Sequence, residues 1–199
     1  MRKRVMSRID TEELLQRYAA GERDFRRARL QGVDLSGANL PEINLDRTNL
    51  TGANLSRANL SGAKFMDACF DGVNLEGANL SKTDLTDVVS NEANWRGVNL
   101  DGAFLQVTRL YSVNLEGATF RGAEFTSAAF QHCNMRNVDL SGATWDMIDN
   151  GGLFDVDLTG AVGEFDLGDF IGVSIILPNG EFLEATWEFI DQKWRSREN

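Results

Sequence analysis

The sequence predicts an all-β solenoid, a fold in which short coils stack along one axis, and three observations lead to that prediction. Every fifth residue from Phe25 to Trp145 is large and apolar at 24 of 25 positions, and Ser90 is the exception. A second column, two residues earlier, holds Ala, Val, Thr, Ile or Cys everywhere except at Arg23. Asn or Asp mostly lies between the columns, and turn-forming residues follow the large residue, as in the runs SGANL, TGANL and EGANL.

Each five-residue unit is interpreted as one short extended edge followed by one turn. Two apolar residues that lie two apart, with a polar residue between them, both point inward from an extended edge. The other two residues must turn the chain, which Gly, Asn and Asp do readily. Because one edge cannot bury its leucine alone, we expect coils to stack about 4.8 Å apart around a continuous column of side chains.

This tandem A-(N/D)-L-x-x pattern resembles the pentapeptide-repeat family, over residues 23–147. The resemblance implies a right-handed quadrilateral β-helix with four pentapeptides per coil, and hence about six to seven coils. Residues 20 apart then stack, which would align opposite charges in three sets: Glu76, Arg96, Glu116 and Arg136; Asp101 and Arg121; Arg47 and Asp67. At Ser90 we expect Trp95 to fill the missing volume, and a local kink or bulge is the alternative.

The N-terminal segment, residues 1–22, is expected to contain a capping helix over residues 11–20. Asp10 or Thr11 can cap its first turn, and Glu13 completes the spacing of a capping box. Gly21 is a suitable stop, and an apolar face is expected from Leu14, Leu15 and Tyr18. The run IDTEELLQRYAAGERDF also resembles the leader of cyanobacterial pentapeptide-repeat proteins, some of which are implicated in regulating cell differentiation.

The C-terminal region, residues 148–199, is expected to hold a frame-shifted last coil and a helical or irregular cap. The frame breaks at residues 149–152, and a strand, a turn and a further short strand or helix start are predicted within residues 171–183. One helical stripe follows at spacings of 4, 3 and 4: Leu183, Trp187, Ile190 and Trp194. The stripe either caps the last coil or forms a homodimer, as the resemblance to gyrase-protecting members allows, so the chain is expected to be a monomer or a C-terminal homodimer.

Composition and charge exclude several classes of function. A net charge of −10 argues against direct binding to nucleic acid. No apolar run is long enough for a membrane span or a secretory signal, and two cysteines are too few for a disulfide framework, so a cytoplasmic location is expected. Four acids belong to a C-terminal acidic surface, either a solvated face or a docking site for a basic partner: Asp155, Asp157, Glu164 and Asp166.

No residue pattern indicates a catalytic, metal or cofactor site. His132 stands beside Cys133, but the second column places Cys133 inside the coil, and Cys69 lies too far away for a disulfide. Apolar residues do occupy positions where the repeat favours polar ones, and they form a candidate protein-contact patch: Val89, Phe104, Val107 and Tyr111, with Met66 and Cys69 as weaker members. The alternative is that these are isolated exposed residues without a role.

The function that these observations favour is a non-enzymatic protein–protein interaction module, a rigid rod acting in regulation. The resemblance to gyrase-protecting proteins adds an alternative, an acidic DNA mimic that binds DNA gyrase or another type II topoisomerase. The partner itself has no signature in the sequence.

Overall fold

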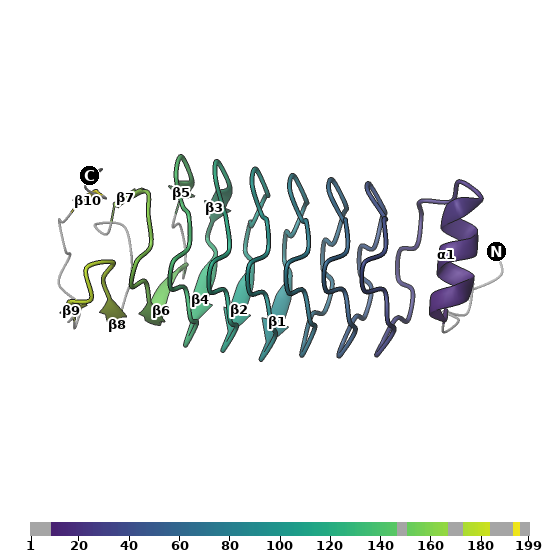
Figure 1. Cartoon of the computed structure of the whole chain (residues 1–199), viewed down its shortest axis with the longest axis horizontal. Helices are drawn as coiled ribbons and strands as arrows, with labels where there is room; N and C mark the ends of the chain where they lie inside the picture. Colours follow the sequence, from purple (N-terminus) through teal and green to yellow (C-terminus); the bar gives the residue numbers. More distant parts are fainter. Residues whose placement is uncertain (1–8, 147–150, 167–172, 184–192, 196–199) are drawn as a thin grey trace.

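The computed structural model describes residues 9–146, 151–166, 173–183 and 193–195. They form a stack of coils along one long axis, with one helix across the N-terminal end and short strands at the C-terminal end (Figure 1). One column of parallel pairings, in which each step spans four pentapeptides, runs through Asp24, Asn44, Lys64, Asp84, Phe104, Glu124 and Thr144. The four-sided register expected from the sequence is confirmed.

The large apolar column forms the core. Leu30, Leu80 and Leu115 are fully buried, as are their counterparts between Leu30 and Leu140, and the small residues two positions earlier are buried beside most of them. Where Phe replaces Leu, neighbouring aromatic rings contact one another in edge-on, tilted or stacked arrangements. Phe125 and Trp145, for example, lie parallel with their centroids 4.0 Å apart. The hydrophobic burial of this column supplies the main driving force for folding.

The hydrogen bonds of the turns explain why most pentapeptides form an isolated β-bridge and a turn and do not form a longer strand. At many positions an Asn or Asp side-chain oxygen accepts the backbone N–H two residues later, as Asn54 does from Ser56 at 3.2 Å. The residue after that N–H has positive φ, which glycine adopts without strain. The five short strands of the regular coils each begin at a residue that is neither Asn nor Asp and therefore does not make this local bond. They are β1 (Val89–Asn91), β2 (Arg109–Tyr111), β3 (Glu124–Thr126), β4 (Ala129–Gln131) and β5 (Thr144–Asp146).

Side-chain ladders run parallel to the axis outside the core. In one column, Asn74 and Asn94 each donate an amide hydrogen to the Asn of the preceding coil, at 3.4 and 3.2 Å. The guanidinium of Arg96 lies 3.8 Å from Glu76 and 3.6 Å from Glu116, so this part of the predicted charge ladder is confirmed. The Arg47–Asp67 pair also forms, at 3.2 Å.

Two details of the ladder differ from the expectation. Asp101 accepts the backbone N–H of Arg121, while the Arg121 guanidinium binds Asp139 at 2.6 Å. Arg136 pairs with Asp157, in the coil beyond, at 3.3 Å. Both arginines therefore pair with a carboxylate in the following coil.

Ser90 causes neither a kink nor a bulge. Val89 pairs with Cys69 on one side and with Arg109 on the other, so the register is unbroken. The Ser90 hydroxyl is buried and donates to the carbonyl of Phe70 at 3.2 Å. Trp95 is fully buried with its ring 5.8 Å from that of Phe70, in agreement with size compensation.

The predicted N-terminal helix is α1 (Thr11–Ala19). The Asp10 side chain accepts the N–H of Glu13 at 2.9 Å, and the helix ends in a Schellman arrangement at Gly21, whose φ is +95°. Leu14 is fully buried against the first coil, whereas Leu15 is 38% exposed and does not belong to the apolar face. Three donors from this segment reach carbonyls of the first coil: Ile9 N to Arg29, Thr11 Oγ1 to Asp34 and Tyr18 Oη to Pro41.

The described residues at the C-terminal end form strands and turns. The frame shift is confirmed, because Phe130 pairs with Leu153 and Asn134 with Asp157, whereas an unbroken repeat would pair Asn134 with Phe154. β6 (Gly152–Asp157) and β8 (Val173–Ile176) extend one sheet in the order β1-β2-β4-β6-β8-β9, and β9 (Phe182–Leu183) is antiparallel to β8. β7 (Glu164–Asp166) pairs with β10 (Lys193–Arg195), also antiparallel. Within the described ranges, no helix has the length and apolar character needed to cross a bilayer.

Candidate functional site

The candidate contact patch lies on two neighbouring sides of the solenoid. The first, here called the Phe104 side, carries the column of pairings that contains Phe104. The second, here called the β2 side, is the sheet that contains β1, β2 and β4. The stretch from Phe104 to Tyr111 crosses from the first side to the second, with Val107 at the corner between them.

The structure brings some of the patch residues together and separates others. Phe104 is 45% exposed, and Val107 is half-buried at the adjoining corner of the same coil. Val89 lies one coil earlier, where it pairs with Arg109. Tyr111 belongs to the same coil as Phe104 and lies at the far end of β2. Phe104 and Val107 therefore form the centre, with Val89 and Tyr111 across the β2 side.

The weaker members stand apart from this centre. Met66, 36% exposed, is in the coil before that of Asp84, two coils from Phe104. Cys69 shares that coil, is half-buried, and contacts Asp71 Oδ2 at 3.3 Å and Thr51 Oγ1 at 3.5 Å. Asp84 and Thr86 of the intervening coil lie between Met66 and Phe104, whereas Cys69 lies on the β2 side, where it pairs with Val89.

Val107 occupies a backbone conformation that does not suit its side chain. Its φ is +55°, in the left-handed region, where a β-branched residue is a genuine outlier. The equivalent corners hold Gly at many positions, including Gly97 and Gly102, with φ of +63° and +65°. A half-buried, strained valine beside an exposed phenylalanine is a feature that core packing does not require.

Carboxylates flank the centre of the patch. Phe104 pairs with Asp84 in the preceding coil and with Glu124 in the following coil. Asp84 Oδ1 accepts the N–H of Thr86 at 3.0 Å. In the described part of the chain, neither Asp84 nor Glu124 forms an ion pair, and the exposed Arg109 lies around the corner on the β2 side. These two acids were not among the residues predicted from the sequence, although the spacing of one coil identifies them.

Of the four predicted C-terminal acids, Asp157 is paired with an arginine, Arg136, at 3.3 Å. His132 Nδ1 lies 3.1 Å from Asp155 Oδ2. Burial alone would raise the pKa of Asp157, but hydrogen bonds from Thr159 and the charge of Arg136 outweigh it and hold that pKa below its usual range. Glu164 and Asp166 lie in β7, at register positions opposite Arg195 and Lys193 of β10.

The predicted helix through Leu183, Trp187, Ile190 and Trp194 is wrong at both of its ends. Leu183 is in β9 and Trp194 is in β10, where it pairs with Phe165. Trp187 and Ile190 lie outside the described residues. Leu183 and Trp194 lie in strands despite their helical spacing because the last coils present open strand edges. The unpaired backbone groups of these edges are satisfied by further strands.

The described side chains form no catalytic or metal-binding constellation that the geometry supports. Burial raises the pKa of the Cys133 thiol to about 11, and its Sγ contacts the carbonyl of Leu110 at 3.4 Å. His132 instead faces outward toward Asp155. Among the residues that the structure describes, no three His, Cys, Asp or Glu side chains converge to hold a metal ion.

The repeat region of the chain matches a known family model. A family model described as pentapeptide repeats matches residues 28–67, 68–106, 78–117 and 108–142. A search of the curated proteins finds no match.

Several solved structures are similar to this chain. HetL, a pentapeptide-repeat protein involved in heterocyst differentiation regulation in the cyanobacterium Nostoc sp. strain PCC 7120, is 21% identical, with 88% of this chain and 100% of that chain covered and a TM-score of 0.28. A trypsin-treated variant of QnrB1, a plasmid-mediated fluoroquinolone resistance protein, is 22% identical, with 72% and 84% covered and a TM-score of 0.39. Rfr23 from the cyanobacterium Cyanothece 51142 is 21% identical, with 70% and 95% covered and a TM-score of 0.33.

Proposed function

The chain belongs to the pentapeptide-repeat family, and from this premise we propose that it is a non-enzymatic protein–protein interaction module acting in regulation. Its working surface is the contact patch of Val89, Phe104, Val107 and Tyr111. The rod is stiff because every coil is hydrogen-bonded to the next through the backbone, so the patch is held in a fixed geometry for a protein partner.

One observation carries this proposal: Phe104 is 45% exposed in a column whose other members are polar. At the same position in neighbouring coils the chain has Asp84 and Glu124, so neither folding nor the column requires an aromatic residue there. Exposing a phenyl ring to water costs free energy that burial under a partner recovers. The strained Val107 beside it supports the same interpretation.

The test is affinity capture of a partner from a lysate of the source organism, with the full-length chain as bait. We expect Phe104→Asp with Tyr111→Asp to abolish capture while the melting temperature stays nearly unchanged. The matched control is Leu15→Asp with Phe182→Asp, which alters two exposed apolar residues outside the patch, 38% and 63% exposed. Capture by the patch variant at the level of the control would refute the proposed surface.

A second candidate function, an acidic DNA mimic that binds DNA gyrase, is favoured by the net charge of −10. Against it, four arginines neutralise carboxylates of adjoining coils: Arg47, Arg96, Arg121 and Arg136. The test is inhibition of gyrase supercoiling by the purified protein. Inhibition that disappears when Asp155, Asp157, Glu164 and Asp166 are neutralised would favour the mimic, and none at high excess would reject it.

A further inference from the structure

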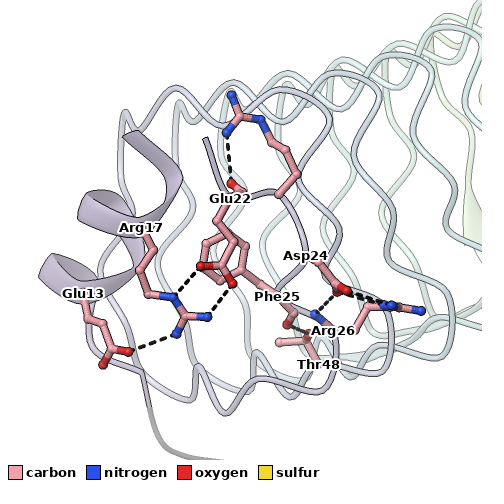
Figure 2. A network of polar contacts seen from close by, with 8 residues as sticks. Glu13, Arg17, Glu22, Asp24, Phe25, Arg26 and Thr48 are labelled. Carbon is pink, nitrogen blue, oxygen red and sulfur yellow. Dashed lines mark hydrogen bonds and ion pairs between the residues drawn. The ribbon is translucent and has the colours of Figure 1, made fainter. Parts of the chain in front are cut away.

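The N-terminal cap shows how this molecule holds an arginine. The Arg17 guanidinium lies over the ring of Phe25, 5.1 Å from its centroid. It binds both carboxylate oxygens of Glu22, at 2.6 and 2.8 Å, and Glu13 at 3.0 Å (Figure 2). A cation is thus held by an aromatic face and by acids on two sides.

The same three components occur on the outside of the rod. Phe104 lies between Asp84 and Glu124 in one column of parallel pairings. Adjacent coils are about 4.8 Å apart, so Asp84 and Glu124 lie on either side of Phe104 along the axis, each one coil away. One oxygen of Asp84 is occupied by the N–H of Thr86, which leaves the other oxygen available to a ligand.

We propose that Asp84, Phe104 and Glu124 bind the guanidinium group of an arginine side chain in a partner protein. The proposal rests on the proposed function and names the chemistry of the partner residue that meets the patch. Among the described residues, no cation of the chain itself takes this place. Lys64 lies on the far side of Asp84 in the column without an ion pair to it, and Arg109 lies on the β2 side.

Arginine fits these groups better than lysine does. Its planar guanidinium stacks on an aromatic ring and still directs N–H donors outward in its own plane, parallel to the ring, toward acids on both sides. A lysine ammonium is a more strongly hydrated point charge and gains less from the ring. Val107, at the adjoining corner, offers apolar contact for the methylene stem of the same arginine.

The direct test is an NMR titration of the isotope-labelled full-length protein with N-acetyl-arginine-methylamide, and with the matching lysine compound. We expect saturable shifts, in the millimolar range, of the amides around Asp84, Phe104 and Glu124 with the arginine probe. The lysine probe should bind several-fold more weakly. Absence of saturable shifts, or equal binding of the two probes, would overturn the proposal.

Variants identify the groups involved. Asp84→Asn with Glu124→Gln should weaken arginine binding by about two- to fivefold for each carboxylate neutralised. Phe104→Leu, which keeps an apolar side chain but removes the ring, should weaken it by a similar factor. Glu92→Gln, an exposed acid at another corner, is the control and should leave binding unchanged. Unchanged binding in the Asp84/Glu124 variant would refute the assignment.

Partner capture separates this proposal from the proposed function. If Phe104→Asp with Tyr111→Asp loses the partner but Asp84→Asn with Glu124→Gln retains it at full strength, the contact surface stands and the arginine site is rejected. If the Phe104/Tyr111 variant retains the partner, the proposed function fails, whatever the titration shows. Loss of the partner in both variants, together with selective arginine binding, supports both.

Discussion

The two ends of the solenoid face the same problem and use different secondary structure to solve it. At the N-terminal end, α1 lies across the first coil, buries Leu14, and together with the preceding Ile9 supplies single donors to the carbonyls of Arg29, Asp34 and Pro41. At the C-terminal end the β ladder continues and then reverses, with β9 antiparallel to β8 and β10 antiparallel to β7. A helix covers core side chains but meets few backbone groups, whereas added strands satisfy the backbone directly.

The largest expected effect is at the N-terminal end. Leu14→Ala should lower the free energy of unfolding by about 2–5 kcal/mol, because it removes a fully buried side chain between helix and coil. Leu15→Ala, one residue along the same helix and 38% exposed, should change it by less than about 0.5 kcal/mol. Urea unfolding of both variants measures the difference. Similar losses would mean that α1 does not pack as described.

At the C-terminal end, the strongest backbone constraint is at Gly163. Its φ is +129°, and an added Cβ would lie 2.7 Å from the carbonyl carbon of Leu140. Gly163→Ala should therefore cost about 2 kcal/mol or more in unfolding free energy, since it combines strain with a backbone clash. In the comparison variant, Gly97→Ala, the new Cβ meets nothing within 4 Å. An equal cost at both positions would show that the contact with Leu140 is unimportant.

The coils between the ends contain a residue whose replacement should stabilise the protein. Val107→Gly relieves a valine at φ +55° and should raise the free energy of unfolding by about 0.5–1 kcal/mol, after the entropic cost of glycine is subtracted. The reverse exchange, Gly97→Val, should lower it by about the same amount, about 0.5–1 kcal/mol. Thermal unfolding provides the measurement. A destabilised Val107→Gly protein would mean that valine is kept for packing.

The smallest effect is expected on acidification, toward the C-terminal end. Burial opposes the ionisation of Asp139 and Asp157, but hydrogen bonds and the charges of Arg121 and Arg136 outweigh it and lower both pKa values. Their contribution to stability is complete above the unfolded pKa of about 3.9 and is lost as the pH falls through the lower folded pKa. Asp139→Asn with Asp157→Asn should therefore flatten the dependence of unfolding free energy on pH below about 4. Parallel curves for variant and parent would contradict this assignment.

The contrast between the ends also explains how far the sequence predicted the structure. The coils, α1 and its cap at Asp10 depend on residues close together in the chain or repeated at fixed spacing, and these were predicted correctly. Leu183 and Trp194 were assigned to a helix because their spacing fits one, but they lie in strands. Strand pairing at an open edge depends on residues distant in sequence, and local periodicity does not report it.

The candidate site was also predicted only in part from the sequence. The exposure of Phe104 follows from its position in the repeat and was predicted. The neighbours that give it a chemical character, Asp84 and Glu124, stand one full coil away on either side and emerge only when the column is assembled. The positive φ of Val107 likewise belongs to a turn position that the residue type alone does not reveal.

Because the register is unbroken between Asp24 and Thr144, deletions of whole repeats would change the position of the patch in a predictable way. Deleting the four pentapeptides from Asn44 to Ala63 would remove one full coil, bring Phe104 about 4.8 Å closer to α1, and leave it facing the same direction. Deleting a single pentapeptide instead would turn everything beyond the cut by one side, so the patch would point a quarter-turn away. Gene segments encoding a whole coil therefore set the distance from α1 to the patch, and segments encoding a single pentapeptide set the direction in which the patch faces.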